Sequence, residues 1–361
     1  MKKLLFCIGT RPEAIKLAPV ILEATARGWE VLVLTTGQHQ DLLEPFLKLF
    51  EIVPDIRLDV LRPGQSLSEL TSRILSEFQP ALTGLKPDLV LTQGDTTTAF
   101  ACALGAFYEK IPVAHIEAGL RTHDPYSPFP EEMNRQLIGR IATYHFPPTE
   151  AARANLIREN ISGASPATGN TGVDALRITL ERISAESDSI NEKSILMTCH
   201  RRENHGAPLE RICRAARRLL DSNPDTHLVF PVHPNPNIKN RVEGLLGDHP
   251  RVRLIAPLGY VEFATAMSRA TLLLTDSGGV QEEAPYLKKP IFVLRESTER
   301  PEGIEAGVAE LVGSDEERIF SSVNRALHDR DYYESFQKAV SPYGDGFASR
   351  RILDVLEGPR P

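Results

Sequence analysis

Short apolar runs alternate with longer amphipathic segments along almost the whole chain. In the first half the apolar runs predict strands at residues 4–8, 31–35, 89–92, 113–116 and 144–146. Helical patterns are expected near residues 14–26, 40–50, 67–82, 97–109, 132–141 and 151–159. Buried strands separated by helices are typical of parallel sheets that carry helices on both faces.

The same alternation restarts in the second half and predicts a second domain. Its strands are expected at residues 195–198, 227–232, 252–255, 272–275 and 291–294. We therefore expect an α/β fold of two doubly wound, Rossmann-like domains, formed by residues 1–168 and 169–344. A helix within residues 345–361 is expected to pack back on the first domain. Because ligands bind beyond the carboxyl ends of strands in open α/β sheets, we expect the site between the domains.

Composition and charge narrow the class of protein. The 361 residues are 41% hydrophobic and 25% charged, which is typical of a globular protein, and the net charge of −7 argues against nonspecific nucleic-acid binding. No apolar run is long enough to span a membrane. The four widely spaced cysteines form no C-x-x-C pair, which favours buried free thiols in a reducing compartment. We expect a cytoplasmic protein with no membrane or nucleic-acid partner.

The segment from His115 to Gln136 is dense in titratable side chains. It begins within a predicted strand and carries Glu117, Arg121, His123, Asp124, Glu131, Glu132 and Arg135. Carboxylates and cations at the carboxyl end of a strand suit proton transfer on a charged substrate. We interpret this segment as part of an active site.

A second feature, TDSGGVQEE, spans residues 275–283 between a predicted strand and a helix. Gly278 and Gly279 expose backbone N–H groups where a phosphate can bind, and Ser277 can cap the helix or donate to that phosphate. Glu283, one turn further on, is placed to accept hydrogen bonds from ribose hydroxyls. The alternative is a plain tight turn followed by an ordinary exposed helix carboxylate.

Arg11 follows the first predicted strand, where its fork of donors suits a phosphate. Lys16, on the same predicted helix, is a further candidate cation, although it could equally be an ordinary surface residue. The dinucleotide fingerprint G-x-G-x-x-G and the P-loop G-x-x-x-x-G-K-[ST] are both absent from the sequence. We expect no cofactor.

Asp95 and His200 each follow a predicted strand. Asp95 precedes three threonines, so it suits either a helix N-cap or a carboxylate aimed into a site. His200 begins HRRENH (200–205), where imidazole and guanidinium groups can meet a phosphate. A zinc site is disfavoured because His200 and His205 lack H-E-x-x-H spacing and no cysteine pair assists them. We expect no bound metal.

These motifs, in this order, resemble those of the non-hydrolysing UDP-N-acetylglucosamine 2-epimerase family. The matches are GTRPEAIK (9–16), GDTTTAF (94–100), HIEAGLRT (115–122), PFPEEMNR (128–135), TGNTGVDAL (168–176), CHRREN (199–204), PVHPNPN (231–237) and TDSGGVQEEAPYLKKP (275–290). The resemblance covers essentially the whole chain. It implies a glycosyltransferase-B-like fold with the active site in the interdomain cleft, a UDP-sugar substrate and a homodimer.

The resemblance also implies roles, position by position. The resemblance assigns acid/base catalysis to Asp95, Glu117 and Glu131, and it places His200 beside the nucleotide phosphates. The implied substrate-binding residues are Arg11, Ser277, Gly278 and Gly279 at the diphosphate, Glu283 at the ribose, Phe263 at the uracil and Arg300 in the cleft, with Lys16 and Arg135 as further candidates.

The reaction that the family implies needs both sets of residues. The C2 proton of a 2-acetamido sugar is weakly acidic, because no neighbouring carbonyl stabilises a carbanion. An epimerase without nicotinamide can instead break the C1–O bond, release UDP, remove the C2 proton to give a glycal, and reverse these steps on the other face. This scheme needs a cationic phosphate site and carboxylates on opposite sides of C2.

One departure from the family concerns regulation. Many bacterial members bind a second substrate molecule as an allosteric activator through polar residues that follow the second strand. The chain keeps Gln38 and His39, but it has Asp41 and Gly64 where a glutamine and an arginine are expected. We expect weak or absent allosteric activation.

Four other functions compete with this interpretation. The nearest is a 2-epimerase of another UDP-2-acetamido sugar, such as a diacetamido-uronate. A hydrolysing epimerase is disfavoured by GTRPEAIK, which resembles the non-hydrolysing branch. A glycosyltransferase or a non-catalytic nucleotide-sugar sensor would have less need of three carboxylates together.

Overall fold

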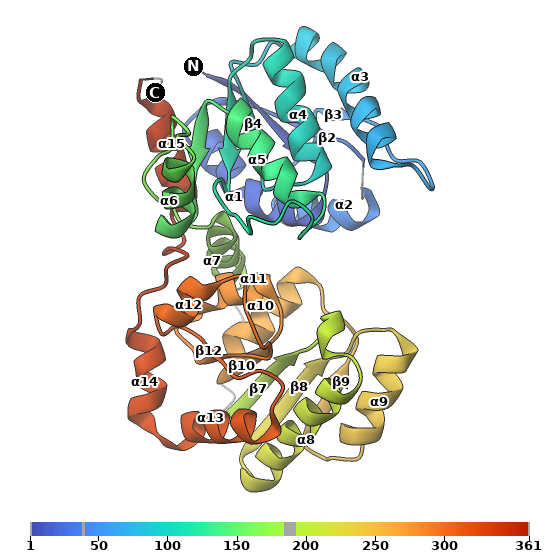
Figure 1. Cartoon of the computed structure of the whole chain (residues 1–361), viewed down its shortest axis with the longest axis vertical. Coiled ribbons are helices and arrows are strands. Elements are labelled where there is room, and N and C mark those ends of the chain that lie inside the picture. Colours follow the sequence, from blue (N-terminus) through green and yellow to red (C-terminus); the bar gives the residue numbers. More distant parts are fainter. Residues whose placement is uncertain (1, 38–39, 184–192, 360–361) are drawn as a thin grey trace. The chain divides into compact units, whose positions relative to one another are not determined.

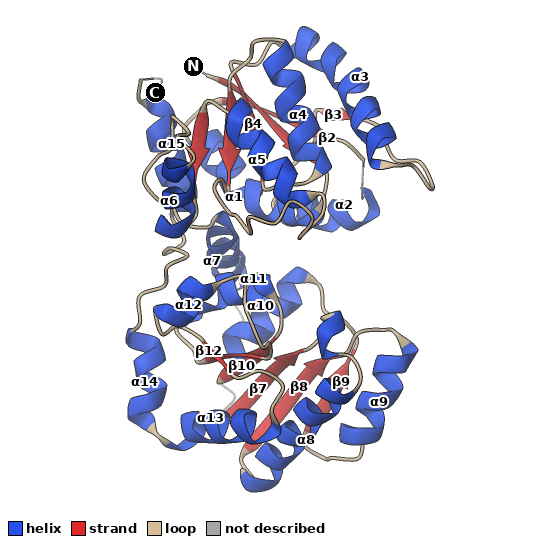
Figure 2. Ribbon diagram, viewed as in Figure 1, coloured by secondary structure: helices blue, strands red, loops and turns tan. Residues whose placement is uncertain are grey.

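The computed structural model describes residues 2–37, 40–183 and 193–359, and its helices and strands are shown in Figures 1 and 2. The chain divides into two compact units, the first containing Met1–Ala175 and Gly344–Pro361 and the second containing Leu176–Tyr343. The boundary at Ala175 lies inside helix α7 (Thr171–Ile183). Each unit has its own parallel sheet with helices on both sides (Figure 2).

The sheet of the first unit has six parallel strands in the order β3-β2-β1-β4-β5-β6. The strands are β1 (Lys3–Ile8), β2 (Glu30–Thr35), β3 (Ile56–Arg57), β4 (Leu89–Gln93), β5 (Val113–Ile116) and β6 (Tyr144–Phe146). Consecutive residues of β1 from Leu4 to Ile8 are fully buried, which requires cover on both faces of the sheet.

Helices connect these strands and supply that cover. They are α1 (Arg11–Ala26), α2 (Gln40–Leu49), α3 (Leu67–Leu85), α4 (Thr97–Tyr108), α5 (Glu131–Ile141), α6 (Glu150–Arg158) and, from the end of the chain, α15 (Ala348–Glu357). Helix α15 packs on α1. The buried Asp174 carboxylate accepts hydrogen bonds from the Ala348 and Ser349 amides at 3.0 and 2.7 Å, which fixes the start of α15.

The second unit repeats the same design. Its six strands are β7 (Lys193–Thr198), β8 (Thr226–Pro231), β9 (Val252–Ile255), β10 (Leu272–Thr275), β11 (Ile291–Val293) and β12 (Glu310–Leu311). Its helices are η1 (Arg202–Asn204), α8 (Ala207–Ser222), α9 (Pro236–Leu246), α10 (Tyr260–Arg269), α11 (Gly278–Glu283), η2 (Ala284–Leu287), α12 (Pro301–Glu305), α13 (Glu316–His328) and α14 (Arg330–Lys338). The order β12-β11-β10-β7-β8-β9 is the first unit's order read from the opposite edge.

This strand order creates a topological switch point in each sheet. The first strand of each sheet pairs with both the second and the fourth, so the connections from these strands run to opposite sides. The switch points lie between β1 and β4 in the first unit and between β7 and β10 in the second. A crevice suited to a ligand is therefore expected beyond the carboxyl ends of these pairs.

The predicted fold class is confirmed, and every predicted strand is present within a few residues of its expected ends. The sequence analysis missed the edge strands β3 and β12, because two residues each are too few to produce a recognisable apolar run. The four cysteines, Cys7, Cys102, Cys199 and Cys213, are buried and form no disulfide, as predicted. No helix in the described ranges is both long and apolar enough to cross a membrane.

Candidate active site

Glu117 lies one residue beyond β5, at the carboxyl edge of the first sheet. Its backbone has a left-handed φ of 65°, and its amide donates to the Phe146 carbonyl at 3.1 Å. Its carboxylate forms an ion pair with Lys16 of α1 and accepts a hydrogen bond from Gln93 at the end of β4. The Lys16 and Glu117 side chains are only 15% and 12% exposed, so this pair is shielded from solvent. A left-handed backbone at a non-glycine residue is uncommon and often marks a functional position.

Asp95 lies in the loop after β4 and pairs with Arg135 of α5. Arg135 Nη2 lies 2.6 Å from Asp95 Oδ2, and the Asn134 side chain donates to the Asp95 carbonyl at 2.9 Å. The N-cap of α4 is Thr96, whose hydroxyl accepts from the Ala99 amide. The interpretation of Asp95 as a helix cap is therefore wrong, and its carboxylate is available for another role.

The buried Glu132 supports this arrangement. It accepts a hydrogen bond from the Thr122 amide at 3.0 Å, and Arg135 Nη1 lies 3.4 Å from its Oε2. Burial opposes ionisation of Glu132, but the Thr122 amide, the Gln136 amide group and Arg135 outweigh it and hold its pKa below the ordinary value. Glu132 thus anchors both Arg135 and the loop that precedes α5.

Glu131 is the first residue of α5 and is half-buried. Within the described residues its carboxylate forms no ion pair, unlike those of Asp95 and Glu117. Arg11, the first residue of α1, is exposed and lies 5.8 Å from the centre of the Phe46 ring. Both side chains are therefore accessible at the carboxyl end of the sheet.

The sequence analysis missed Glu13, a buried carboxylate on α1 that is 1% exposed. Glu13 Oε2 accepts from the amides of Gly9 and Thr10 at 2.9 and 2.5 Å, and Oε1 accepts from the Thr96 hydroxyl at 2.6 Å. One side chain therefore ties the loop before Arg11 to the loop that contains Asp95. Burial raises the pKa of Glu13 to about 7, although these hydrogen bonds oppose the shift.

Gly9 and His115 keep the same two loops close to the sheet. A Cβ atom on Gly9 would lie 2.2 Å from Thr98 Oγ1, so only glycine permits this approach of the first loop to α4. His115 Nε2 lies 2.7 Å from the Gly94 carbonyl, directly before Asp95. Burial lowers the pKa of His115 to about 3, so this imidazole is neutral and acts as a structural donor.

The second cluster lies at the β7–β10 switch point and is centred on Asp276, which is fully buried. Asp276 Oδ2 accepts hydrogen bonds from the amides of His200 and Arg201, both at 2.8 Å, and from the Asn204 side chain at 3.0 Å. His200 Nδ1 lies 3.0 Å from Asp276 Oδ1, and the His200 side chain is 48% exposed. Burial opposes ionisation of Asp276, but His200 and the Arg201 amide outweigh it and lower its pKa.

The predicted phosphate-binding turn begins helix α11, which has only six residues. Ser277 occupies the N-cap position but makes no side-chain capping hydrogen bond, which leaves its hydroxyl for another partner. Arg300 packs over this turn, because a Cβ on Gly278 would lie 3.1 Å from its guanidinium carbon. Glu282, which is 6% exposed, holds Arg300 there through an ion pair of 2.8 Å.

Glu283 and Phe263, the predicted ribose and uracil residues, lie on neighbouring parts of the second unit. Glu283 ends α11, and Phe263 lies on α10, which contacts the turn η2 that follows α11. Burial and the negative charge of Glu283 together raise the pKa of Tyr260, at the start of α10. Phe263 is half-buried against the core of the second unit.

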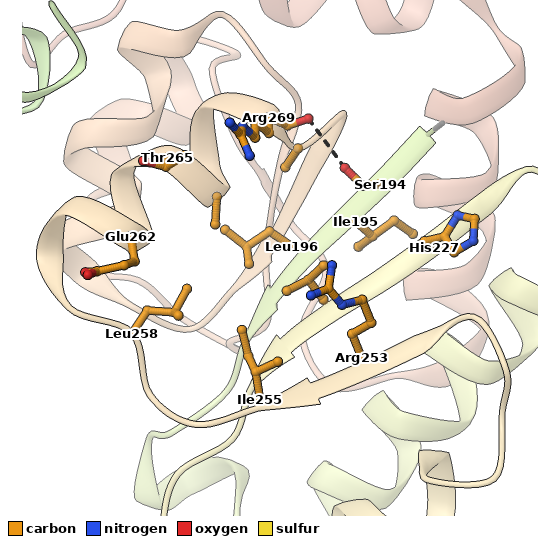
Figure 3. Close-up of a pocket in the computed structure, with 13 residues that line it drawn as sticks. Ser194, Ile195, Leu196, His227, Arg253, Ile255, Leu258, Glu262, Thr265 and Arg269 are labelled. Atoms are coloured by element: carbon orange, nitrogen blue, oxygen red, sulfur yellow. Dashed lines mark hydrogen bonds between the residues drawn. The ribbon is translucent and has the colours of Figure 1, made fainter. Parts of the chain in front are cut away.

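A separate cavity of about 310 Å³ lies in the second unit between strands β7–β9 and helix α10 (Figure 3). Ser194 donates to the Arg269 carbonyl at 3.4 Å across one end of it. None of the predicted site residues lines this cavity. No cluster of three or more His, Cys, Asp or Glu side chains suited to a metal ion occurs in the described part of the chain.

Comparison with known proteins identifies the family. The family model for UDP-N-acetylglucosamine 2-epimerase matches residues 23–357. The UDP-N-acetylglucosamine 2-epimerase of Salmonella typhimurium is 48% identical over 99% of both chains. The crystal structure of UDP-GlcNAc 2-epimerase from Neisseria meningitidis bound to UDP-GlcNAc superposes with a TM-score of 0.86, at 44% identity over 98% of this chain and 99% of that one.

A solved structure of lower sequence identity indicates the same family. UDP-GlcNAc 2-epimerase from Methanocaldococcus jannaschii, in complex with UDP-GlcNAc and UDP, gives a TM-score of 0.77 at 35% identity and covers 98% of this chain and 99% of that one. These relatives cover nearly the whole chain, and the family model covers all of it from residue 23 to residue 357. The chain belongs to the UDP-N-acetylglucosamine 2-epimerase family.

Proposed function

We propose that this protein interconverts UDP-GlcNAc and UDP-ManNAc without releasing free sugar. The observation that carries the proposal is the pairing of two carboxylates, Asp95 with Arg135 and Glu117 with Lys16, at the carboxyl edge of one sheet. Each ion pair holds its carboxylate in one orientation. Proton transfer to or from carbon depends strongly on the orientation of the acid or base relative to that carbon. A glycosyltransferase or a sensor has no comparable need for oriented carboxylates.

In the proposed reaction the carboxylates at the carboxyl edge of the first sheet, which we call the first cluster, move protons. The C1–O bond breaks, its electron pair leaves with UDP, and a carboxylate removes the C2 proton to form a 2-acetamidoglucal. A second carboxyl group then protonates C2 on the opposite face while UDP rejoins C1. We assign these proton transfers to Asp95, Glu117 and Glu131, with Lys16, Gln93 and Arg135 holding the first two in position.

The second cluster binds the departing diphosphate in this scheme. The Ser277 hydroxyl, the backbone N–H groups of Gly278 and Gly279 and the guanidinium of Arg300 all lie at the start of α11, whereas the Ser277 N–H donates to the Thr275 hydroxyl. His200 and Arg11 supply further donors to the phosphates, while Glu283 and Phe263 bind the ribose and the uracil. Donors and cations placed where negative charge develops lower the barrier to C1–O cleavage.

The relatives support this substrate. The protein from Neisseria meningitidis binds UDP-GlcNAc, and the one from Methanocaldococcus jannaschii binds UDP-GlcNAc and UDP. Identities of 44% and 35% over nearly the whole chain make the same nucleotide sugar the best-supported substrate here.

Weak or absent allosteric activation is a further part of the proposal. Gln38 and His39 lie outside the described residues. Gly64 has a left-handed φ of 69°, and it offers no side-chain cation to an anionic activator. Sigmoidal kinetics with UDP-GlcNAc, or a requirement for traces of it when UDP-ManNAc is the substrate, would contradict the proposal.

Incubation with UDP-GlcNAc in heavy water, followed by NMR, tests the proposed reaction. We expect UDP-ManNAc that carries deuterium at C2. Free ManNAc and UDP would instead indicate a hydrolysing enzyme. An unchanged substrate would favour a different UDP-2-acetamido sugar, and sugar transfer without C2 exchange would indicate a transferase.

A further inference from the structure

We propose that Asp276 is a positioning residue that holds the His200 imidazole by its Nδ1–H and leaves Nε2 as the nitrogen that faces the substrate. The proposal rests on the proposed function in one respect only, the role of His200 beside the departing diphosphate. Asp276 itself does not touch the substrate in this account.

The location of Asp276 makes it a rigid support. It directly follows β10, and its amide donates to the Thr198 carbonyl at 3.2 Å, which continues the pairing of β10 with β7. The Thr198 and Thr275 hydroxyls lie 2.7 Å apart across the same two strand ends. A fully buried carboxylate at this position has little freedom to move.

The two oxygens of Asp276 have different partners. Oδ2 receives three hydrogen bonds, from the His200 amide, the Arg201 amide and the Asn204 side chain. Oδ1 is buried and accepts no hydrogen bond of standard geometry from the described residues, and the His200 Nδ1 atom lies 3.0 Å from it as a donor that can satisfy it. The first oxygen therefore fixes the loop that carries His200, while the second can act on the imidazole ring.

The chemistry of the pair determines which nitrogen carries the proton. An ionised carboxylate only accepts hydrogen bonds, so Nδ1 must be the protonated nitrogen of neutral His200. The neighbouring Cys199 thiol does not compete as an anion, because burial and the charge of Asp276 raise its pKa well above the ordinary value. Nε2 is then the ring nitrogen that is left to exchange a proton or hydrogen bond with a ligand.

This assignment has a functional consequence. When Nε2 is protonated, the imidazolium donates to a phosphate oxygen, and its charge is balanced by Asp276 rather than by solvent. When that proton leaves, the ring keeps its orientation, because Nδ1–H still faces Oδ1. A histidine without Asp276 could rotate or adopt the other tautomer, and fewer molecules would be ready for C1–O cleavage.

The substitution Asp276→Asn tests this directly because it keeps the shape of the side chain. The Asn oxygen can replace Oδ2 and retain the three hydrogen bonds to the loop, while its NH2 group replaces Oδ1. That NH2 is a donor, so it favours His200 with an unprotonated Nδ1 and a protonated Nε2. The variant therefore reverses the tautomer and leaves the loop attached.

The His200 tautomer and the rate of deuterium incorporation should both change in Asp276→Asn. In protein labelled with 15N histidine, with His200 assigned by comparison with His200→Gln, the wild type should show protonated Nδ1 at alkaline pH and the variant protonated Nε2. Deuterium incorporation at C2 should fall by about 100-fold or more in the variant, whereas the Kd for UDP should change by less than about threefold.

The matched control is Asn204→Ala, a change in the loop that carries His200; it removes hydrogen bonds of 3.0 Å to Asp276 and to the Leu294 carbonyl, which follows β11. It should lower the melting temperature, retain the wild-type His200 tautomer and keep turnover within about threefold, because the imidazole contact is untouched. A loss of turnover in this control equal to that of Asp276→Asn would reduce Asp276 to a loop anchor and overturn the proposal.

Other outcomes test the proposed role of Asp276 even if Asp276→Asn is unstable. Protonated Nε2 on neutral His200 in the wild type overturns the proposal without any variant. A reversed tautomer in Asp276→Asn with turnover within about threefold of wild type also overturns it. If the wild type shows no exchange with UDP-GlcNAc, the proposed function fails, but the tautomer measurement still tests the Asp276–His200 pair independently.

Discussion

Asp95 and Arg135 form an ion pair in which Oδ2 and Nη2 lie 2.6 Å apart, and this contact joins the loop after β4 to helix α5. Arg135 also lies 3.4 Å from the buried Glu132, which anchors it from the other side. The carboxylate of Asp95 is therefore held by a cation that cannot easily move. This geometry is the strongest reason to place Asp95 in the proton-transfer machinery.

Asp95→Asn removes the basic oxygen while it keeps the size of the side chain. We expect C2 exchange to fall by about 10³-fold, because general acid/base catalysis contributes on the order of 10²–10⁴-fold. The Kd for UDP, measured by calorimetry, should stay within about threefold, because the second cluster is untouched. Asp124→Asn, on the exposed loop before α5, is the control and should leave both values near wild type. Wild-type turnover in Asp95→Asn would remove this residue from the mechanism.

Lys16→Met replaces an ammonium with an apolar side chain of similar length beside Glu117. Because both side chains are largely shielded, the lost partner should destabilise the fold by about 3 kcal/mol at neutral pH. Turnover should fall by about 10- to 100-fold as the carboxylate loses its fixed direction, and Lys16→Arg should restore part of it. Urea unfolding and steady-state kinetics measure the two effects. Lys48→Met, at an exposed position of α2, should change neither, and equal behaviour of the two Met variants would contradict the role of Lys16.

Gly278→Ala tests whether Arg300 and the start of α11 act as one phosphate site. The new Cβ would lie 3.1 Å from the guanidinium carbon of Arg300, so the arginine or the turn must shift. We expect UDP binding to weaken by about tenfold, equivalent to about 1.4 kcal/mol. Gly244→Ala, in helix α9 where an added Cβ meets no atom within 4 Å, should keep UDP affinity unchanged. Unaltered UDP affinity in Gly278→Ala would argue against this turn as the diphosphate site.

Acid should destabilise the first unit through its buried histidines. Burial lowers the pKa of His115 to about 3 and that of His145 to about 4. The unfolded chain takes up these protons below about pH 6.5 and the folded protein does not, so stability is full above that pH and is lost as the pH falls toward 4. The two histidines should together contribute a loss of several kcal/mol, on the basis of about 1.4 kcal/mol per pKa unit for each. Glu13 offsets part of this loss, because its pKa of about 7 lets the folded protein take up a proton before the unfolded chain does.

Melting temperatures between about pH 7.5 and 4.5 measure this loss. His145→Leu should flatten part of the decline, because the variant has one fewer imidazole to protonate on unfolding. A decline in His145→Leu as steep as that of the wild type would show that other groups cause the acid sensitivity.

Much of the fold, and the placement of candidate site residues at the ends of strands, could be predicted from the sequence. The strands are continuous apolar runs, and the polar groups that follow them, such as Glu117 and Ser277, necessarily lie at the carboxyl edge of a parallel sheet. The capping box of α1, Thr10 with Glu13, is also local in sequence. Such features depend on neighbouring residues and are therefore visible without a structure.

The partners of these groups could not be predicted, because they come from distant parts of the chain. Thr96 completes the contacts of Glu13 from 83 positions away, and Lys16 reaches Glu117 across 101 positions. Nothing local in the sequence distinguishes Asp276, because the His200 and Arg201 amides that donate to it lie 76 and 75 positions away. Tertiary packing, rather than local propensity, determines which polar groups hold the candidate catalytic residues.

The proposed epimerisation proceeds through cleavage of the C1–O bond. It is tested most directly with UDP-GlcNAc that carries 18O in the bridge between C1 and the β-phosphorus. If UDP departs and returns, its β-phosphate oxygens exchange places, and NMR should find label in non-bridging positions of recovered UDP-GlcNAc and of UDP-ManNAc. Complete retention of the label in the bridge, in molecules that have been epimerised at C2, would contradict the account.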